Sequence, residues 1–317
     1  MKKFANKKIL IFGVTGQDGS LLAKEFLNKN YKVYGVLTSN RKNFKNLNRL
    51  KILDKLTLID SSRIKTSKII LNSKCSYIFF FSGLSSVTKS NLYKNLSLNS
   101  NNKLLIEILE TIRVHKLKKI KVLNASSSEI FGNNRGYNTE DSEINPASYY
   151  GLAKSISTEI CKAYRLQFGI KVFNAILFNH ESPLRPSEYV LQKVISGVKK
   201  ISLKKEQKLL LGNIDVSRDW GWAPEYVRIM NKLIDIKNPG DFIISTGKNV
   251  KLKDVIKKIF LYYKLDYRKY TKISKNLLRP YEIEKISGNN KKLTKEINYK
   301  PKILINEIIK KMIKKEY

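Results

Sequence analysis

Cysteine and histidine are scarce in this sequence, which has two of each among its 317 residues. Cys75 and Cys161 lie far apart, and neither has a companion at a metal-ligand spacing. We therefore expect no disulfide framework and no metal site. Long apolar runs are also missing: none approaches the ~20 residues that cross a membrane, and the run after the basic start is too short for a signal-peptide core. These absences predict a cytoplasmic protein without a membrane segment.

Acidic residues are few relative to basic ones. The chain has 62 Lys and Arg against 26 Asp and Glu, a formal net charge of +36. A charge of this size would suit a nucleic-acid partner. However, the lysines are spread along the whole chain among Asn and Ile, and no nucleic-acid-binding motif accompanies them. We therefore predict no nucleic-acid partner, and expect the positive charge to help attract an anionic substrate.

Apolar runs alternate with helical patterns through the first half of the chain. The run 9–12 is continuously apolar, as expected for a parallel strand that is covered on both faces. Further strands are predicted at 33–37, 56–59, 77–81, 122–125 and 172–178, with amphipathic helices after the first strand and at 98–112. This alternation predicts an α/β fold with a doubly wound parallel sheet of the Rossmann type.

The pattern becomes less regular after Phe178. Most of the prolines fall in this part of the chain: Pro183, Pro186, Pro224, Pro239, Pro280 and Pro301. We therefore expect a first domain at 1–178 and a smaller C-terminal lobe at 179–317. Some later segments are expected to return to the sheet, so that the two parts are interleaved.

A glycine-rich loop follows the first predicted strand and opens the first predicted helix. It reads G-V-T-G-Q-D-G from Gly13 to Gly19. Glycines three apart let the backbone turn tightly and approach a pyrophosphate, which then lies at the helix N-terminus. The spacing resembles that of short-chain dehydrogenases/reductases, and in this context a plain strand-to-helix turn is the weaker interpretation. We predict a dinucleotide site at Gly13, Thr15, Gly16, Gln17, Asp18 and Gly19, which makes the first domain the cofactor domain and leaves the lobe for substrate.

The residues after the second predicted strand bear on which dinucleotide binds. An acidic residue at this position would bind the ribose 2′-hydroxyl of NAD. The sequence instead reads Leu37-Thr38-Ser39-Asn40-Arg41, without a carboxylate. The hydroxyls of Thr38 and Ser39 and the guanidinium of Arg41 suit a 2′-phosphate, which predicts NADP. Arg41 could also be an ordinary surface arginine.

Tyr150 and Lys154 stand four residues apart at the start of a helical pattern. This spacing places both side chains on one face, about one turn apart. A lysine ammonium beside a phenol lowers the pKa of the phenol from its ordinary value of about 10. We therefore predict that Tyr150 accepts a proton from a sugar hydroxyl while hydride passes to a nicotinamide.

The fifth predicted strand ends in A-S-S-S-E-I-F-G, which includes Ser127 and Glu129. In short-chain dehydrogenases/reductases a Ser or Thr at this strand end completes the Tyr-Lys site, and Ser127 is the candidate here. Glu129 is the kind of carboxylate that a sugar dehydratase needs, since such an enzyme removes the proton at carbon 5 and expels the 6-hydroxyl as water. Taken alone, Glu129 is better explained as a residue that caps or solvates the loop.

Three longer segments resemble GDP-mannose 4,6-dehydratases. Residues 178–183 read F-N-H-E-S-P, residues 211–221 read L-G-N-I-D-V-S-R-D-W-G, and residues 279–282 read R-P-Y-E. The resemblance extends over nearly the whole chain, with its motifs in the family's order. It implies that the chain is a hydro-lyase acting on a GDP-sugar, and that it forms a homodimer or homotetramer.

The resemblance also implies a role for each matching residue. Ser127, Glu129 and Tyr150 would be catalytic, and Lys154 would assist them and hold the nicotinamide ribose. NADP would be contacted by Phe81, Ser82, Gly83, His180 and Arg185. The GDP-sugar would be contacted by Ser85, Asn179, Lys193, Arg218, Arg279 and Glu282, together with Ser127 and Glu129.

The chain departs from the family at several of these positions. It has Thr38 and Ser39 where the family carries an Arg-Arg pair, and Ser127 where the family carries Thr. It reads F-S-G-L-S-S-V at 81–87 where the family reads L-A-A-Q-S-H-V, so that Leu84 replaces a glutamine. These differences leave open whether the sugar is a hexose or a heptose.

Two other functions compete with the dehydratase. A nucleotide-sugar epimerase or 4-ketoreductase would need Ser127, Tyr150 and Lys154 but no working Glu129. A non-enzymatic binding protein would need none of them, and the intact set of four side chains argues against it.

Overall fold

The computed structural model describes residues 7–37, 43–134 and 136–317 of the chain. Thr38, Ser39 and Arg41, on which the prediction of NADP rests, lie outside the described residues.

A seven-stranded sheet forms the centre of the molecule, in the order β11-β7-β5-β4-β1-β2-β3. All its neighbouring strands are parallel. The strands are β1 (Lys8–Phe12), β2 (Lys32–Leu37), β3 (Thr57–Asp60), β4 (Tyr77–Phe80), β5 (Lys121–Ser127), β7 (Lys171–Leu177) and β11 (Asp241–Ile244). The chain runs outward from β1 in one direction and then returns to continue from β4 in the other. This is the doubly wound order, and it confirms the predicted fold class.

Strand β1 shows why a continuous apolar run forms the middle of this sheet. Successive side chains of a strand point to opposite faces. Ile9 and Ile11 accordingly lie in one hydrophobic core, while Leu10 and Phe12 lie in another on the opposite face. All four side chains are fully buried.

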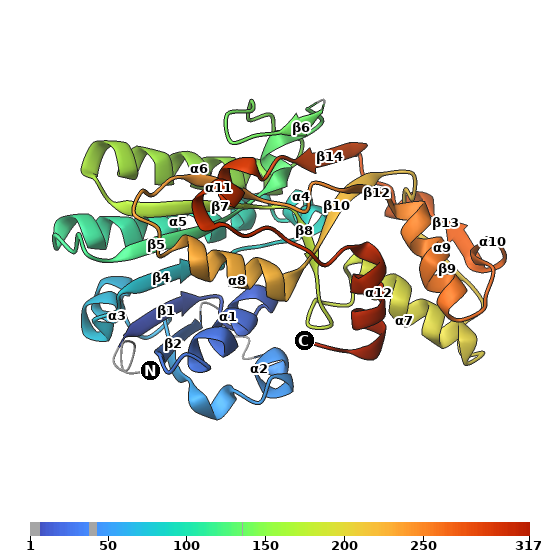
Figure 1. The fold of residues 1–317 in the computed structure, drawn as a ribbon, viewed down its shortest axis with the longest axis horizontal. Coiled ribbons are helices and arrows are strands. Elements are labelled where there is room, and N and C mark those ends of the chain that lie inside the picture. The colour runs from blue at the N-terminus through green and yellow to red at the C-terminus, as the bar shows by residue number, and fades with distance from the viewer. Residues whose placement is uncertain (1–6, 38–42, 135) are drawn as a thin grey trace.

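Helices cover both faces of the sheet (Figure 1). One core contains apolar residues of α1 (Gln17–Leu27), α8 (Ala223–Leu233) and α11 (Lys291–Ile297). The other contains residues of α3 (Thr66–Ser73), α5 (Lys94–Val114) and α6 (Tyr149–Phe168). Shorter helices in the connections are α2 (Lys45–Arg49) and α4 (Val87–Leu92), with 3₁₀ turns η1 (Leu53–Lys55), η2 (Ser128–Phe131) and η3 (Lys275–Leu277).

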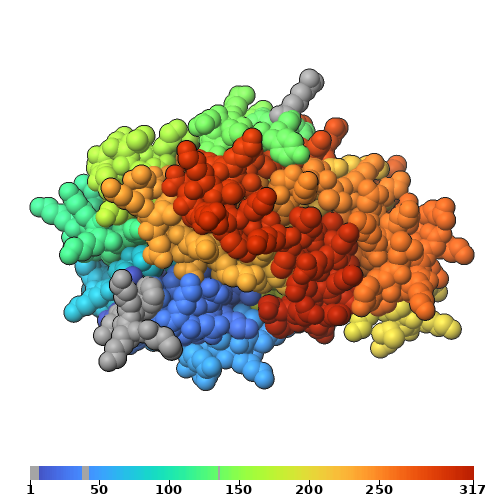
Figure 2. All heavy atoms as spheres, in the orientation of Figure 1, coloured from blue at the N-terminus to red at the C-terminus, as the bar shows by residue number. Residues whose placement is uncertain are grey.

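The later part of the chain builds a lobe at one end of the sheet (Figure 1). Its helices are α7 (Val190–Ser202), α9 (Leu252–Tyr262), α10 (Tyr267–Tyr270) and α12 (Ile305–Lys314). Its strands β9 (Leu209–Leu211) and β13 (Thr271–Ile273) pair with each other. Apolar residues of α7, α9 and α12 form a separate core there. In Figure 2 the last residues of the chain, in red, lie on the surface beside this lobe.

A second sheet joins the lobe to the central domain. It contains β6 (Tyr137–Asn138), β8 (Asn179–Glu181), β10 (Ser217–Trp222), β12 (Asn249–Lys251) and β14 (Lys285–Gly288). Strand β10 lies in its centre, between β12 and β14, and also pairs with β8. Strand β11 and helix α8 come from the second half of the sequence but pack in the central domain. The division at residue 178 therefore remains a proposal. Among the described residues, no helix combines the length and apolar character needed to cross a membrane.

Candidate active site

A cavity of about 530 Å³ opens where β1, β4, β5 and β7 end. In a parallel sheet of this order, ligands bind at the carboxyl ends of the strands, where the strand order reverses. All the described residues that were predicted to contact the dinucleotide line this cavity: Gly13, Thr15, Gly16, Gln17, Asp18, Gly19, Phe81, Ser82, Gly83, Tyr150, Lys154, His180 and Arg185.

The glycine loop brings the end of β1 against the loop that follows β4. Gly13 has a φ of +82°, and a Cβ atom there would lie 2.9 Å from the backbone carbon of Phe81. A side chain at this position would be strained by its backbone and would also collide with that loop. Gly16 is the N-cap residue of α1, and it makes no side-chain hydrogen bond that would cap this helix N-terminus. The loop and the helix therefore fit the pyrophosphate of a dinucleotide.

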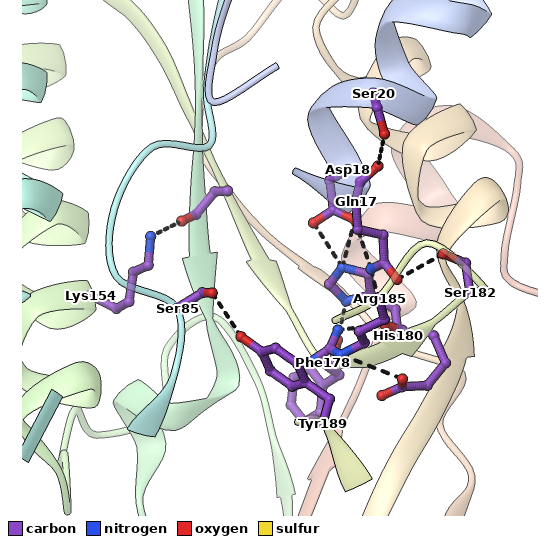
Figure 3. A network of polar contacts seen from close by, with 12 residues as sticks. Gln17, Asp18, Ser20, Ser85, Lys154, Phe178, His180, Ser182, Arg185 and Tyr189 are labelled. Atoms are coloured by element: carbon purple, nitrogen blue, oxygen red, sulfur yellow. Dashed lines mark hydrogen bonds and ion pairs between the residues drawn. The ribbon is translucent and has the colours of Figure 1, made fainter. Parts of the chain in front are cut away.

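Asp18 and His180 contact each other on one wall of the cavity, where His180 is buried and Asp18 is half-buried (Figure 3). The His180 Nε2 atom lies 2.9 Å from a carboxylate oxygen of Asp18, and Nδ1 lies 2.7 Å from the carbonyl oxygen of Phe178. Burial raises the pKa of Asp18, but the charge and hydrogen bond of His180 outweigh burial, so the pKa is lowered overall. Asp18 is therefore a fixed anion in this wall.

Tyr150 lies in the first turn of α6, close to the turn that carries Glu129. The Ser148 hydroxyl caps the helix by accepting a hydrogen bond from Gly151 N at 3.0 Å. A Cβ atom on Gly151 would lie 2.6 Å from the carbonyl oxygen of Glu129. Only glycine permits this approach, so the local sequence holds Tyr150 and Glu129 in one part of the cavity.

Lys154 does not act on Tyr150 as predicted. Its ammonium donates to the carbonyl oxygen of Ala125 at 2.8 Å and lies 6.0 Å from the centre of the Tyr150 ring. Burial raises the pKa of Tyr150, against a hydrogen bond from Ser127 and the charge of Arg185. The predicted lowering by Lys154 is therefore wrong. The spacing places both residues on one helix face. However, the Lys154 ammonium group hydrogen-bonds to the carbonyl oxygen of Ala125 and not to the Tyr150 hydroxyl.

Burial also affects Lys154, lowering its pKa to about 8. A buried ammonium without a carboxylate partner is costly, which favours the neutral amine. Lys154 is thus fixed beneath Tyr150 by its bond to Ala125, with a proton that it can lose near neutral pH.

Ser127 and Glu129 follow from the end of β5 into the turn η2. The backbone N–H of Glu129 donates to the Ser127 hydroxyl at 3.3 Å. The Glu129 side chain is half-buried and lines the cavity. Burial raises its pKa, against the charges of Arg279 and Arg218. A carboxyl group with a raised pKa is a stronger base than an ordinary carboxylate, and it can return the proton that it accepts.

The residues predicted to contact substrate are not all in one place. Ser85, Ser127, Glu129, Asn179 and Arg279 line the main cavity. Arg218 and Glu282 form an ion pair at 3.0 Å, and Glu282 also pairs with Arg279 at 3.2 Å. Lys193 instead lines a second cavity of about 550 Å³ within the lobe.

Tyr189 lines the main cavity but was not predicted from the sequence. Its hydroxyl lies 2.7 Å from that of Ser85, and its ring lies 4.1 Å from the guanidinium carbon of Arg185 (Figure 3). Beside this contact, Lys89 pairs with Glu188 at 2.9 Å. These contacts join the loop after β4 and helix α4 to the segment before α7. No local spacing signals them, because Ser85 and Tyr189 are 104 residues apart.

Among the described residues, no group of three or more His, Cys, Asp or Glu could hold a metal ion. Cys75 and Cys161 are buried free thiols.

The sheet order, the glycine loop and the Ser-Tyr-Lys set together define an extended short-chain dehydrogenase/reductase with a nicotinamide-dinucleotide site. A family model described as GDP-mannose 4,6 dehydratase matches residues 10–312. The chain belongs to this family, as the sequence motifs predicted.

Curated relatives match along nearly their whole length. GDP-mannose 4,6 dehydratase 1 of Arabidopsis thaliana is 30% identical over 97% of this chain and 89% of its own. The GDP-mannose 4,6 dehydratase of Dictyostelium discoideum is 30% identical, over 98% of this chain and 96% of its own.

Solved structures share the fold at lower identity. The dTDP-glucose 4,6-dehydratase of Bacillus anthracis, in complex with NAD, has a TM-score of 0.84 and 17% identity, covering 97% of this chain and 96% of that chain. The UDP-glucose 4-epimerase of Thermotoga maritima, with UDP-glucose, also has a TM-score of 0.84, with 19% identity and 97% of each chain covered.

Proposed function

We propose that this chain is a nucleotide-sugar 4,6-dehydratase, which converts GDP-mannose or a GDP-manno-heptose into the GDP-4-keto-6-deoxy sugar and water. The observation that carries the proposal is the half-buried carboxylate of Glu129, in the same cavity as Ser127 and Tyr150. An epimerase or ketoreductase has no use for a base at this position. The names of the curated relatives support the same reaction.

Tyr150 is assigned the first proton transfer, from the hydroxyl at carbon 4 of the sugar. A bound nicotinamide would accept the hydride from carbon 4 and return it to carbon 6, so the reaction has no net redox change. Ser127 hydrogen-bonds the Tyr150 oxygen and favours its ionised form. Lys154 holds its amine at Ala125, beneath the tyrosine, and is assigned to the nicotinamide ribose.

Glu129 is assigned the elimination. The ketone at carbon 4 acidifies the hydrogen at carbon 5, and the Glu129 carboxylate takes that proton. The electron pair of the carbon–hydrogen bond forms a double bond to carbon 6, and the carbon 6–oxygen bond breaks. The proton held by Glu129, or one from the Ser127 hydroxyl, joins the departing oxygen to make water. When hydride returns to carbon 6, the electron pair of the double bond takes a proton at carbon 5, which comes from solvent in exchange for the proton that Tyr150 accepted. One carboxyl group can serve as base and then as acid because its raised pKa keeps both forms accessible.

NADP is the proposed cofactor. The support is the sequence after β2, which has no acidic residue between Leu37 and Asp54 but includes Thr38, Ser39 and Arg41. The purified protein is expected to bind NADP more tightly than NAD in a fluorescence titration, and Arg41→Ala is expected to reduce this preference. A preference for NAD that is unchanged by Arg41→Ala would contradict the assignment.

The remaining polar residues are assigned to the substrate. Arg218 and Arg279 suit its diphosphate, because guanidinium groups bind phosphate oxygens in pairs. Asn179 and Ser85 would contact the sugar, and Lys193 and Glu282 the nucleoside.

The decisive experiment is incubation of the purified protein with GDP-mannose and, separately, GDP-manno-heptose. Mass spectrometry should detect the loss of one water from one of the two, without consumption of added NADPH. A product of unchanged mass that is inverted at carbon 4 would identify an epimerase instead. Consumption of NADPH in proportion to product would identify a ketoreductase.

We also infer that the chain forms a homodimer or homotetramer. The support is a set of exposed apolar side chains on the adjacent helices α5 and α6: Leu96, Ile106, Leu152 and Ile156. Sedimentation of the purified protein tests this, and a monomer at micromolar concentration would contradict it.

A further inference from the structure

Four charged side chains meet beside the cavity, and they come from three separate parts of the chain. Glu129 belongs to η2, Arg218 to β10, and Arg279 and Glu282 to the segment before β14. Arg218 Nη2 lies 3.0 Å and Arg279 Nη1 lies 3.2 Å from the same oxygen, Oε1 of Glu282. One carboxylate oxygen therefore holds both guanidinium groups.

Asn133 fixes the segment of Glu282 to the turn of Glu129. Its side-chain amide donates to the Tyr281 hydroxyl at 3.1 Å and to the Glu282 carbonyl at 3.2 Å. Its Oδ1 accepts from Glu284 N at 2.9 Å. Pairing of β10 with β14 brings Arg218 opposite Ile286 in the same region. The four charges are thus held together by the backbone around them.

The groups that face Glu129 come from every element packed around it. Arg279, Arg218 and Glu282 act on it through their charges, and Tyr150 approaches from α6. Lys154, also on α6, is turned away to Ala125. Two positive groups and one negative group therefore surround the Glu129 carboxylate, and the two positive groups are the ones that suit a diphosphate.

We propose that the diphosphate of the bound nucleotide sugar takes Arg218 and Arg279 from Glu282, and thereby increases the affinity of Glu129 for a proton when substrate arrives. This proposal rests on the proposed function, since it requires a diphosphate at the two arginines. Phosphate oxygens compete well for guanidinium groups because their paired hydrogen bonds are strong. Once the arginines are neutralised by the diphosphate, they no longer favour the ionised form of Glu129, and Glu282 is left as an uncompensated neighbouring anion.

The consequence concerns catalysis directly. Glu129 becomes a stronger base only when the diphosphate is in place. The carboxylate is then better able to hold the proton from carbon 5 until the hydroxyl leaves carbon 6. Before substrate arrives, Glu282 holds the two arginines in place.

The test is proton uptake on binding of GDP, which carries the diphosphate but cannot react. Isothermal titration calorimetry of the NADP-loaded protein is run in buffers of different ionisation enthalpy, between about pH 5 and pH 8. The wild type should take up more protons than Glu129→Gln, by up to about one per GDP bound. The difference should peak between the free and bound pKa values of Glu129 and vanish above and below them. Protons exchanged by GDP itself are common to both proteins and cancel.

Two further variants sharpen the result. Arg279→Gln should bind GDP more weakly and reduce the extra uptake, while Glu284→Gln, an exposed neighbour, should keep it. Equal uptake by wild type and Glu129→Gln overturns the proposal, and so does failure of GDP to bind. Should Glu129→Gln not fold, unchanged uptake in Arg279→Gln overturns it instead. Turnover of GDP-mannose is measured separately, so failure of the proposed reaction is distinguished from failure of this coupling.

Discussion

Asp18 and Glu129 line two different regions of the cavity, and the protein treats these two carboxylates in opposite ways. Burial opposes the ionisation of both. In the cofactor loop, His180 lies 2.9 Å from Asp18 and overcomes burial, so the pKa of Asp18 is lowered. In the turn after β5, Arg279 and Arg218 are bound to Glu282, burial prevails, and the pKa of Glu129 is raised.

The difference corresponds to what each region has to do in the proposed reaction. The cofactor would be restored at the end of each cycle. The cavity wall at Asp18 and His180 can therefore keep the same charges throughout the reaction. The substrate would enter, lose water and leave, so the group that handles its proton must change state. A permanent partner for Glu129 would prevent that change. Charge pairing therefore distinguishes Asp18 from Glu129, the proposed catalytic carboxylate.

The largest expected effect concerns Glu129 and activity. Glu129→Gln keeps the shape of the side chain but removes the base, so dehydration should fall by about 10² to 10⁴-fold. The first hydride transfer, which depends on Tyr150, should survive. Addition of GDP-mannose to the NADP-loaded variant should therefore produce the absorbance of reduced nicotinamide without dehydrated product.

The matched control for that variant is Tyr150→Phe, which removes the phenol and keeps the ring. It should lose both the absorbance change and the product. If Glu129→Gln instead makes normal amounts of the 4-keto-6-deoxy sugar, the assignment of the elimination to Glu129 is wrong.

The next effect concerns Asp18 and stability. Asp18→Asn removes the charge opposite His180 inside the cavity wall, which should cost about 2–3 kcal/mol in the free energy of unfolding, measured with urea near pH 6. The folded-state pKa of Asp18 is lowered, so its contribution is fully present above the ordinary pKa and disappears as the pH falls through the lowered value.

An exposed ion pair provides the control for this measurement. Glu307 and Lys311 lie 3.7 Å apart on the surface of α12. Glu307→Gln should cost no more than about 0.5 kcal/mol. An equally small cost for Asp18→Asn would show that the Asp18–His180 pair is not structural.

Most of the central sheet could be predicted because its signals are local. The run Ile9–Phe12 is continuously apolar because its residues enter two cores in alternation. Strand β11 was not predicted by position, since Asp241–Ile244 is short and lies in a part of the chain without regular alternation. Its place in the sheet depends on pairing with β7.

The residues of the candidate site also fall into two groups, those that a local motif indicates and those that depend on long-range contacts. The glycine loop and the Ser127, Glu129 and Tyr150 set lie in contiguous motifs, so the sequence alone indicates them. The substrate arginines could be proposed only through the family resemblance, because Arg218 meets Glu282 across 64 residues of sequence. The role of Asn133 has no sequence signal, since it depends on contacts with a segment 149 residues away. Local chemistry is predictable here, and the pairing of distant charges is not.

The smallest expected effect is that of Glu129→Gln on the free energy of unfolding. It tests the comparison between Asp18 and Glu129 most directly, because its sign is opposite to that of Asp18→Asn. The folded-state pKa of Glu129 is raised above its ordinary value by burial. Ionisation of Glu129 therefore lowers the free energy of unfolding. This cost is absent below the ordinary pKa of a glutamate. It grows as the pH rises from the ordinary pKa to the raised pKa, and it is constant above the raised pKa.

Glu129→Gln has no such cost, so near pH 7.5 the variant should be more stable than the wild type, by less than the cost of Asp18→Asn. The advantage should shrink as the pH is lowered through the raised pKa of Glu129, because the wild-type carboxyl then becomes protonated. Urea unfolding of both proteins at several pH values measures this difference directly. The same amide-for-carboxyl exchange would then destabilise the cofactor wall and stabilise the proposed catalytic turn. If Glu129→Gln is less stable than the wild type at every pH, Arg279 and Arg218 compensate the Glu129 charge in the resting protein. The two carboxylates would then be alike, and the contrast drawn between the two regions would fail.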